Sequence, residues 1–243
     1  MNAVLDRLEK VRAAIADAAS RSGRSADEIE LVAVSKTHPP EAVAEALAEG
    51  QTLFGESRVQ EARAKIPLVS GRARWHFIGH LQKNKIRHAL GLGFELFHGI
   101  NSLETARELD RIAAADGAYP KILLEVNVAG ESSKFGFSPA KLAAQLEELI
   151  GLERVQIEGL MTIAPLAAEA EQSRRYFVAL RELRDKLQSE FRMPLPKISM
   201  GMSGDYTVAV EEGATLVRVG TAIFGTRSGK AWKPAGDAAN SED

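Results

Sequence analysis

The sequence predicts an α/β fold, a single (β/α)8 TIM-like barrel with an extra N-terminal helix. Short apolar runs alternate with amphipathic segments along the chain, and eight runs are candidate strands. The length, 243 residues, is close to the ~250 residues typical of this fold. Strands that alternate with helices form right-handed βαβ units and therefore a parallel sheet. A doubly wound open sheet is the alternative, because the same alternation builds it.

A helix is expected at the start of the chain, before the first strand. Apolar residues there recur at the spacing of one helix face: Val4, Leu8, Val11 and Ile15. Gly23 ends this helix, and Ser25 with Glu28 then fits a capping box. The predicted strands cover residues 31–35, 52–55, 74–78, 95–99, 121–126, 155–160, 196–199 and 215–219. The predicted helices cover residues 41–49, 56–66, 102–115, 138–150, 169–190 and 205–212.

One barrel domain is expected over residues 1–227, followed by a disordered tail at 228–243. The tail is rich in Gly, Ala, Asn, Ser and acidic residues, and Trp232 is its one bulky side chain. Such a composition cannot bury enough apolar surface to fold. No linker, low-complexity segment or internal repeat divides the rest of the chain.

Composition excludes several classes of function. A net charge of −2 gives no field that would attract nucleic acid or an anionic membrane. The absence of cysteine excludes disulfides, thiolate zinc sites, iron–sulfur clusters and a cysteine nucleophile. The N-terminus lacks the basic start and apolar core of a signal peptide, and no apolar stretch approaches the ~20 residues needed to span a bilayer. A cytoplasmic protein is therefore predicted.

Lys36 stands where the first predicted strand ends. The apolar run 31–35 meets a turn that contains Pro39 and Pro40, a pattern typical of a buried parallel strand. Active sites of (β/α)8 barrels lie at the carboxyl ends of the strands. Burial disfavours an ammonium group, and a neutral lysine amine can attack an aldehyde to form a Schiff base. The alternative is that Lys36 only marks the strand end and reaches into solvent.

Two loops near the other end of the chain predict a phosphate site. Gly220 and Thr221 lie between the last strand and a short helix, where barrels often bind phosphate. The glycine lets the backbone approach an anion, free N–H groups at a helix start act as donors, and the threonine hydroxyl adds one more. Ser203 and Gly204 offer the same groups in the loop before. The alternative is that Ser203 or Asp205 is only an N-cap and Gly220 only a tight turn.

Arg218 is expected to project into the barrel near the end of the last strand. A buried arginine needs a partner, and either the ring nitrogen of a cofactor or a structural carboxylate could serve. An aldehyde for Lys36, a phosphate for Gly220 and Thr221 and a ring nitrogen for Arg218 together describe pyridoxal 5′-phosphate, PLP. The last predicted strand, which leads into Gly220, neighbours the first strand when a barrel closes.

The chain resembles the pyridoxal phosphate homeostasis protein family, also called YggS or PROSC, from about residue 3 to residue 227. The matching stretches are 32–36, 54–56, 75–85, 125–128, 133–137, 159–162, 199–205 and 218–225. Their number and order make the match specific. The family usually reads Gly-Glu-Asn where this chain has Gly55-Glu56-Ser57, which puts in doubt any pocket contact that the asparagine makes.

The resemblance implies a fold-type III PLP-binding barrel similar to the N-terminal domain of alanine racemase. PLP is expected as an internal aldimine on Lys36. Its ring nitrogen is expected to meet Arg218. Its phosphate is expected to meet Ser203, Gly204, Gly220 and Thr221.

The family is associated with control of the intracellular PLP pool and is not credited with robust catalysis. An arginine at the pyridine nitrogen disfavours protonation there, which weakens the ring as an electron sink. A racemase also needs a second acid–base group, and none of the three tyrosines has an obvious place in that role, although Tyr206 lies nearest the presumed site. PLP and apo PLP-dependent enzymes are the expected partners. The expected assembly is a monomer. A PLP-dependent amino-acid racemase using Lys36 as base is the alternative, and a barrel binding another phosphorylated metabolite is the third hypothesis.

No metal site is predicted. His76 and His80 are four residues apart, but they flank a strand end and lack the intervening carboxylate of a His-Glu-x-x-His motif. The basic run 83–88 predicts a solvated helix face. Ile163 is a candidate contact for the cofactor ring. The methionines near the strand ends predict core positions: Met161, Met200 and Met202.

Overall fold

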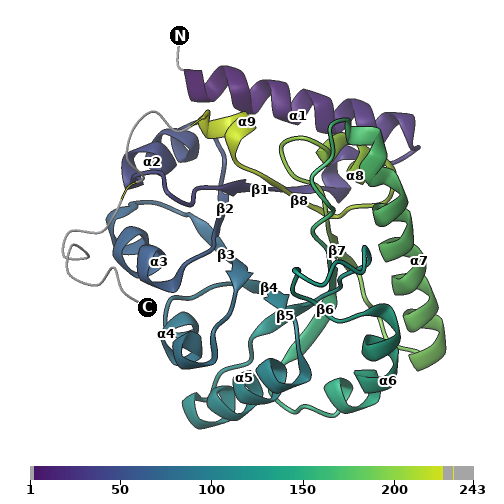
Figure 1. Cartoon of the computed structure of the whole chain (residues 1–243). Helices are drawn as coiled ribbons and strands as arrows, with labels where there is room; N and C mark the ends of the chain where they lie inside the picture. Colours follow the sequence, from purple (N-terminus) through teal and green to yellow (C-terminus); the bar gives the residue numbers. More distant parts are fainter. Residues whose placement is uncertain (1–2, 227–231, 233–243) are drawn as a thin grey trace.

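Eight parallel strands close into a barrel in the computed structural model, which describes residues 3–226 and Trp232. Neighbours in sequence are neighbours in the barrel, and the last strand pairs with the first (Figure 1). The strands are β1 (Glu30–Val34), β2 (Leu53–Glu56), β3 (Arg74–His80), β4 (Leu96–Ile100), β5 (Lys121–Glu125), β6 (Gln156–Met161), β7 (Lys197–Ser199) and β8 (Leu216–Val219). The predicted (β/α)8 barrel is confirmed, and the open sheet is wrong because β1 and β8 are hydrogen-bonded neighbours.

Helices surround the strands on the outside (Figure 1). They are α1 (Ala3–Arg21), α2 (Pro40–Ala48), α3 (Val59–Lys65), α4 (Ile86–Leu90), α5 (Leu103–Asp116), α6 (Pro139–Ile150), α7 (Arg174–Phe191), α8 (Tyr206–Glu211) and α9 (Thr221–Phe224). Short 3-10 turns add η1 (Ala26–Glu28), η2 (Ile66–Leu68), η3 (Lys83–Lys85) and η4 (Ala170–Ser173). The predicted tail 228–243 lies outside the described residues, except for Trp232.

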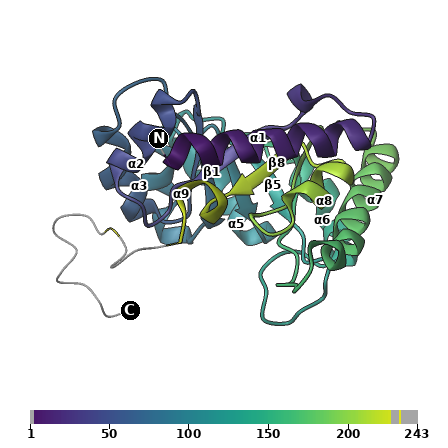
Figure 2. The same cartoon turned by 90° about the horizontal axis from the view of Figure 1, so that it is seen from above.

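The extra N-terminal helix α1 crosses the outside of the barrel and packs on α8 and α9 (Figures 1 and 2). Its predicted apolar face is buried, which stabilises the contact because each buried aliphatic side chain contributes about 1.5–3 kcal/mol. Gly23 follows the helix at φ +70°, a conformation that glycine adopts readily. The capping box is confirmed, since the Ser25 N–H donates to Glu28 Oε1 at 2.9 Å and Ser25 caps η1.

The start of one helix differs from the sequence prediction. The helix expected from residue 56 begins at Val59, because Glu56 is fully buried and pairs with Phe77 as the last residue of β2. The basic run 83–88 spans η3 and the start of α4. Within this run Ile86 is buried and the charged residues Lys83 and Arg87 are exposed, as a solvated helix face requires.

Two apolar cores hold the fold together. The larger one lies between the strands and the helices. The smaller one fills the inside of the barrel and contains inward-facing residues of six strands: Val32, Leu53, Leu96, Leu123, Met161 and Leu216. The prediction of a core position is confirmed for Met161 and Met200, which are buried, whereas Met202 is exposed.

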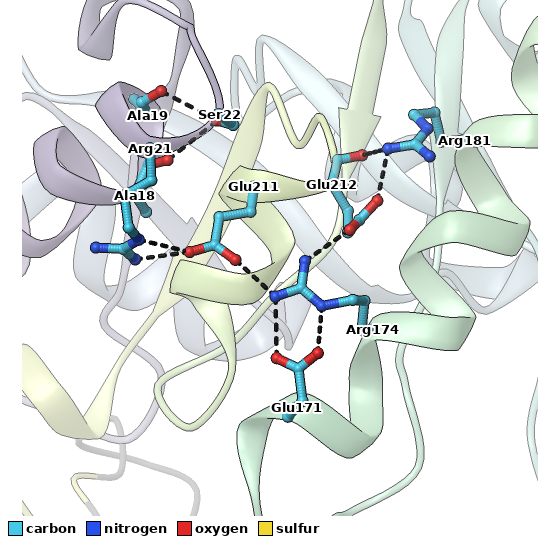
Figure 3. A network of polar contacts seen from close by, with 9 residues as sticks. All are labelled: Ala18, Ala19, Arg21, Ser22, Glu171, Arg174, Arg181, Glu211 and Glu212. Carbon is cyan, nitrogen blue, oxygen red and sulfur yellow. Dashed lines mark hydrogen bonds and ion pairs between the residues drawn. The ribbon is translucent and has the colours of Figure 1, made fainter.

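A network of ion pairs joins the helices on the side of α8 (Figure 3). Arg174 bonds Glu171, Glu211 and Glu212, which raises the pKa of its guanidinium. Arg21 of α1 binds the other oxygen of Glu211 at 2.7 Å. Single exposed pairs contribute little, but this network bridges four separate elements, α1, η4, α7 and α8. It therefore fixes α8, which follows the loop 199–205.

Gly79 provides a test of the packing between β3 and the residues that follow β2. A Cβ atom on Gly79 would lie 2.1 Å from the backbone oxygen of Ser57, whereas one on Gly204 would meet nothing within 4 Å. We expect Gly79→Ala to lower the free energy of unfolding by about 1–3 kcal/mol through overpacking. Gly204→Ala, the control, should change it by less than about 0.5 kcal/mol. Urea unfolding measures both, and equal midpoints in the two variants would contradict the packing.

Candidate functional site

Polar side chains lie directly above the apolar core inside the barrel. Alternate residues of a strand face the same side, so the inward positions after Leu96, Leu123 and Leu216 are His98, Glu125 and Arg218. Ser199 of β7 bonds to this group. All four are buried: His98, Glu125, Ser199 and Arg218. Buried polar groups need partners, so this layer is a candidate site at the carboxyl end of the barrel.

Arg218 is the centre of this layer. It is 5% exposed, donates from Nη1 to Ser199 Oγ at 2.5 Å and donates from Nη2 to the Thr162 carbonyl at 2.9 Å. Burial lowers its pKa to about 10, against the opposing charges of Glu125 and Asp205. The guanidinium is therefore cationic at neutral pH, and the predicted inward orientation is confirmed.

A chain of hydrogen bonds continues from Arg218 across the barrel. Ser199 Oγ lies 2.9 Å from His98 Nδ1, and His98 Nε2 lies 3.0 Å from His76 Nδ1. Arginine can only donate, and among the described residues His98 is the remaining acceptor for the Ser199 hydroxyl. Each group therefore donates to the next, and both histidines carry their proton on Nε2.

Burial keeps these histidines neutral. It lowers the pKa of His76 to about 3, with help from the charges of Arg74 and Lys197. It also lowers the pKa of His98 well below its ordinary value, with further contributions from His76 and Arg218. His98 is thus an acceptor for Ser199, and the chain holds the guanidinium of Arg218 in one orientation.

Glu125 is the last residue of β5, the strand next to the one that carries His98. Its burial raises the pKa of the carboxyl group, and the charge of Arg218 opposes the shift. Glu125 also lines a pocket of about 170 Å³ together with Asn127, Phe135 and Ile163. Ile163 is partly exposed there, and its contact with a cofactor ring stays a prediction.

Lys36 lies in the turn that follows β1, at the predicted end of the barrel. Its side chain is exposed. The expectation that the protein buries this amine is therefore wrong, and the alternative that Lys36 reaches into solvent describes this structure. What is fixed is the backbone on either side, since Ser35 is buried and Thr37 adopts a left-handed conformation with φ +68°.

The predicted phosphate residues come together at the start of α9. Ser203 Oγ accepts hydrogen bonds from the Gly220 N–H at 3.2 Å and from the Ala222 N–H at 3.3 Å. The turn that presents Ser203 is closed by Asp205, whose Oδ1 accepts from the Met202 N–H at 2.7 Å. The two loops thus form one unit, and Ser203 bridges them instead of capping α8.

The two glycines of this unit have different roles. A Cβ atom on Gly220 would lie 3.3 Å from both Cβ and the carbonyl oxygen of Val34, so this glycine lets β8 approach β1. The expectation that Gly220 provides access for an anion misses this packing role. Gly204 faces open space, and among the described residues neither its N–H nor the hydroxyl of the exposed Thr221 has a hydrogen-bond partner.

The other residues considered from the sequence lie elsewhere. His80 bonds Asn101 at 2.7 Å and stacks on Phe135, so His76 and His80 have separate partners. Among residues 3–226 and Trp232, no group of His, Asp or Glu could hold a metal ion. In the same part of the chain, no helix is long and apolar enough to cross a membrane. Ser57 lines a pocket of about 310 Å³ with Arg58 and Lys85.

These residues fit PLP as a ligand. Unpartnered donors at Gly204 and Thr221 suit a phosphate. Arg218 is a buried cation that already bonds Ser199 and Thr162 and has further N–H donors, so it suits a neutral ring nitrogen as acceptor. The sequence prediction missed His98, Ser199 and Glu125. A signal was present for His98 and Glu125, because each is a polar residue at an inward position of a mostly apolar strand.

Known proteins share this fold and are similar in sequence over most of the chain. Residues 7–228 match the family described as alanine racemase, N-terminal domain. An alanine racemase of Clostridium difficile has 19% sequence identity and a TM-score of 0.65, over 83% of this chain and 56% of that chain, which shows the fold alone. The protein is thus a barrel of the alanine racemase N-terminal class.

More similar relatives define the family within this class. The pyridoxal phosphate homeostasis protein of Aquifex aeolicus is 42% identical over 228 residues, 93% of this chain and 99% of that protein. The homologous protein of Escherichia coli K12 is 40% identical over 93% of this chain and 98% of its own length. The structure of PipY of Synechococcus elongatus with PLP bound has 40% identity and a TM-score of 0.81, over 91% of this chain and all of that one. The chain belongs to the pyridoxal phosphate homeostasis protein family.

Proposed function

We propose that this protein binds PLP at the mouth of its barrel and serves PLP homeostasis, holding the cofactor on Lys36 without strong catalytic turnover. The register between β1 and β8 carries the proposal. Val32 pairs with Arg218 and Ala33 with Val219, so Lys36 and the unit formed by Ser203 and Gly220 leave the barrel on neighbouring strands. Amine, buried cation and phosphate donors therefore face one ligand.

Each group has a distinct task in this proposal. When bound, PLP supplies an electrophilic aldehyde and an electron-accepting ring. Lys36 would hold the cofactor through its primary amine, the kind of group that reacts with an aldehyde. Arg218 donates a hydrogen bond to the ring nitrogen. The phosphate accepts from the Gly204 N–H and the Thr221 hydroxyl, beside the start of α9 where Ser203 and Gly220 meet.

The state of Arg218 argues against strong turnover. Its pKa of about 10 keeps it protonated at neutral pH, so it donates to the ring nitrogen and leaves no proton there. An unprotonated ring withdraws electrons less, which disfavours carbanion chemistry. Tyr206, the tyrosine nearest the proposed site, is partly buried, and this burial raises the pKa of its phenol, so its phenolate is less available as a base.

Absorption spectroscopy and a transfer assay test the proposed function. Protein loaded with PLP should show a band near ~420 nm, as a lysine imine of this cofactor does, and borohydride should remove it. Apo PLP-dependent enzymes should then recover activity in proportion to the cofactor delivered. A protein that stays colourless with PLP would support another phosphorylated ligand, and multiple turnover with D- or L-amino acids would support the racemase.

The proposal extends to partners and location. Recipient apo-enzymes, a cytoplasmic location and a monomeric state belong to it as predictions. Light scattering after gel filtration measures the mass in solution, and a mass near 26.3 kDa is expected. A mass near twice this value would contradict the monomer.

Thr221 gives a prediction for the phosphate site. Thr221→Ala should weaken PLP retention by about tenfold, because it removes one hydrogen bond to a charged group, while the band near ~420 nm should still form at saturating PLP. Equilibrium dialysis measures the affinity, and the spectrum measures the covalent bond. Thr226→Ala, which changes an exposed threonine just after α9, is the control. Equal affinity in Thr221→Ala and the parent would contradict the phosphate role.

A further inference from the structure

A buried charge cluster lies directly behind the turn that carries Lys36. It consists of Glu56 at the end of β2 and of Glu61 and Lys65 on α3. The Lys65 side chain is completely buried, and its Nζ donates to Glu56 Oε1 at 2.7 Å, Glu61 Oε1 at 2.8 Å and the Ser35 carbonyl at 2.9 Å. All three ammonium donors are therefore used.

The cluster holds the backbone on both sides of Lys36. Before it, Ser35 gives its carbonyl oxygen to Lys65, and its hydroxyl donates to Glu56 Oε1 at 2.7 Å. After it, the Thr37 N–H donates to Glu61 Oε1. Thr37 has φ +68°, which a β-branched residue rarely adopts. Such a conformation persists only where the surroundings fix it, and these bonds supply that constraint.

Trp232 covers the same cluster from the C-terminal segment. The backbone N–H of Trp232 donates to the Thr37 carbonyl at 3.0 Å. Its ring centre lies 5.2 Å from Lys65 Nζ. A cation over an aromatic face is attracted by the ring, more strongly when desolvated. Thr37 is thus bonded at its N–H by Glu61 and at its carbonyl by Trp232.

We propose that the Glu56–Glu61–Lys65 cluster, covered by Trp232, is a positioning device that fixes the turn at Lys36 for reaction with an aldehyde. This inference rests on the proposed role of Lys36. The lysine side chain is long and exposed, so the place of its Nζ depends on where its Cα is held. Displacement of a reacting group by about 1 Å can cost about a hundredfold in rate, which gives the constraint a function.

The experiment compares a ligand that reacts with Lys36 and one that cannot. PLP carries the aldehyde, and pyridoxine 5′-phosphate carries an alcohol in its place with the same ring and phosphate. The first readout is the rate at which the band near ~420 nm forms with PLP. The second is the dissociation constant for pyridoxine 5′-phosphate. The third is hydrogen exchange of the Thr37 amide without any ligand.

Glu61→Ala should slow band formation by about tenfold or more and speed exchange at Thr37 by a similar factor, because a charge-assisted hydrogen bond is lost. Affinity for pyridoxine 5′-phosphate should be unchanged. Glu61→Gln keeps an oxygen acceptor and should restore most of the rate. Glu45→Ala, at an exposed glutamate of α2, is the matched control and should behave as the parent.

Trp232→Ala gives a second test at the edge of the cluster, which stays informative if Glu61→Ala does not fold. Band formation should slow several-fold, and Trp232→Phe should retain most of the rate because it keeps an aromatic ring over Lys65. Parental rates in Glu61→Ala and Trp232→Ala would overturn the positioning role alone. An equal loss of affinity for pyridoxine 5′-phosphate would also overturn it. A parent protein without the band would overturn the proposed function instead.

Discussion

Lys36→Ala is expected to abolish both the band near ~420 nm and the covalent retention of PLP. The imine needs a primary amine at the barrel mouth, and Lys36 is the residue that the β1 turn presents there. Its side chain is exposed, so its removal should change the free energy of unfolding by less than about 0.5 kcal/mol. Loss of the band would then report chemistry and not misfolding.

Mass spectrometry after borohydride reduction gives the decisive measurement for Lys36. The parent should gain the mass of one phosphopyridoxyl group, on the peptide that contains Lys36, and Lys36→Ala should gain none. Lys83→Ala is the matched control, because Lys83 is another exposed lysine, in the turn after β3. A reduced adduct on Lys36→Ala, or a normal band in its spectrum, would place the reactive amine elsewhere.

The sequence predicted this end of the barrel because the signals there are local. Lys36 follows one apolar run, and Gly220 with Thr221 follows another, so the parallel fold alone brings them to one edge. The pairing of β1 with β8 then sets them side by side. The capping box at Ser25 is local in the same sense, since both of its partners lie within three residues.

The interior polar layer and the buried cluster could not be derived in the same way. His98 and Ser199 are 101 residues apart, and Ser35 and Glu56 are 21 apart, so their contacts depend on strand register and helix placement. Gly220 is one residue whose role the sequence alone did not reveal. A Gly-Thr turn after a strand suggests room for an anion, whereas the close approach of Val34 is visible only once the barrel closes.

The neutral histidines inside the barrel predict a loss of stability in acid. The pKa of His76 is lowered to about 3 by burial, and that of His98 is lowered well below 6.5. In the unfolded chain both titrate near 6.5. Below pH 6.5 the unfolded chain therefore binds more protons than the folded one, and the free energy of unfolding falls by about 1.4 kcal/mol for each histidine and pH unit.

Two buried carboxyl groups act in the opposite direction over part of this range. Burial raises the pKa of Glu56 and of Glu125 above 4.5. The stability that such groups contribute is complete below about pH 4.5 and is lost as the pH rises through their folded values. Between these limits they offset part of the loss caused by His76 and His98. A measurement on the parent alone would therefore understate the histidine effect.

A double variant, His76→Gln with His98→Gln, separates the two contributions. At pH 7 it should be less stable than the parent by about 2–4 kcal/mol, because buried hydrogen bonds are altered at two positions. As the pH falls from 6.5 to 4, this difference should shrink by up to roughly 2.8 kcal/mol per pH unit and then change sign, since the variant has neither group to protonate. Urea unfolding at several pH values measures the difference, and His88→Gln, at an exposed histidine of α4, is the control. A gap between double variant and parent that stays constant from pH 7 to 4 would mean that His76 and His98 are not held neutral by the fold.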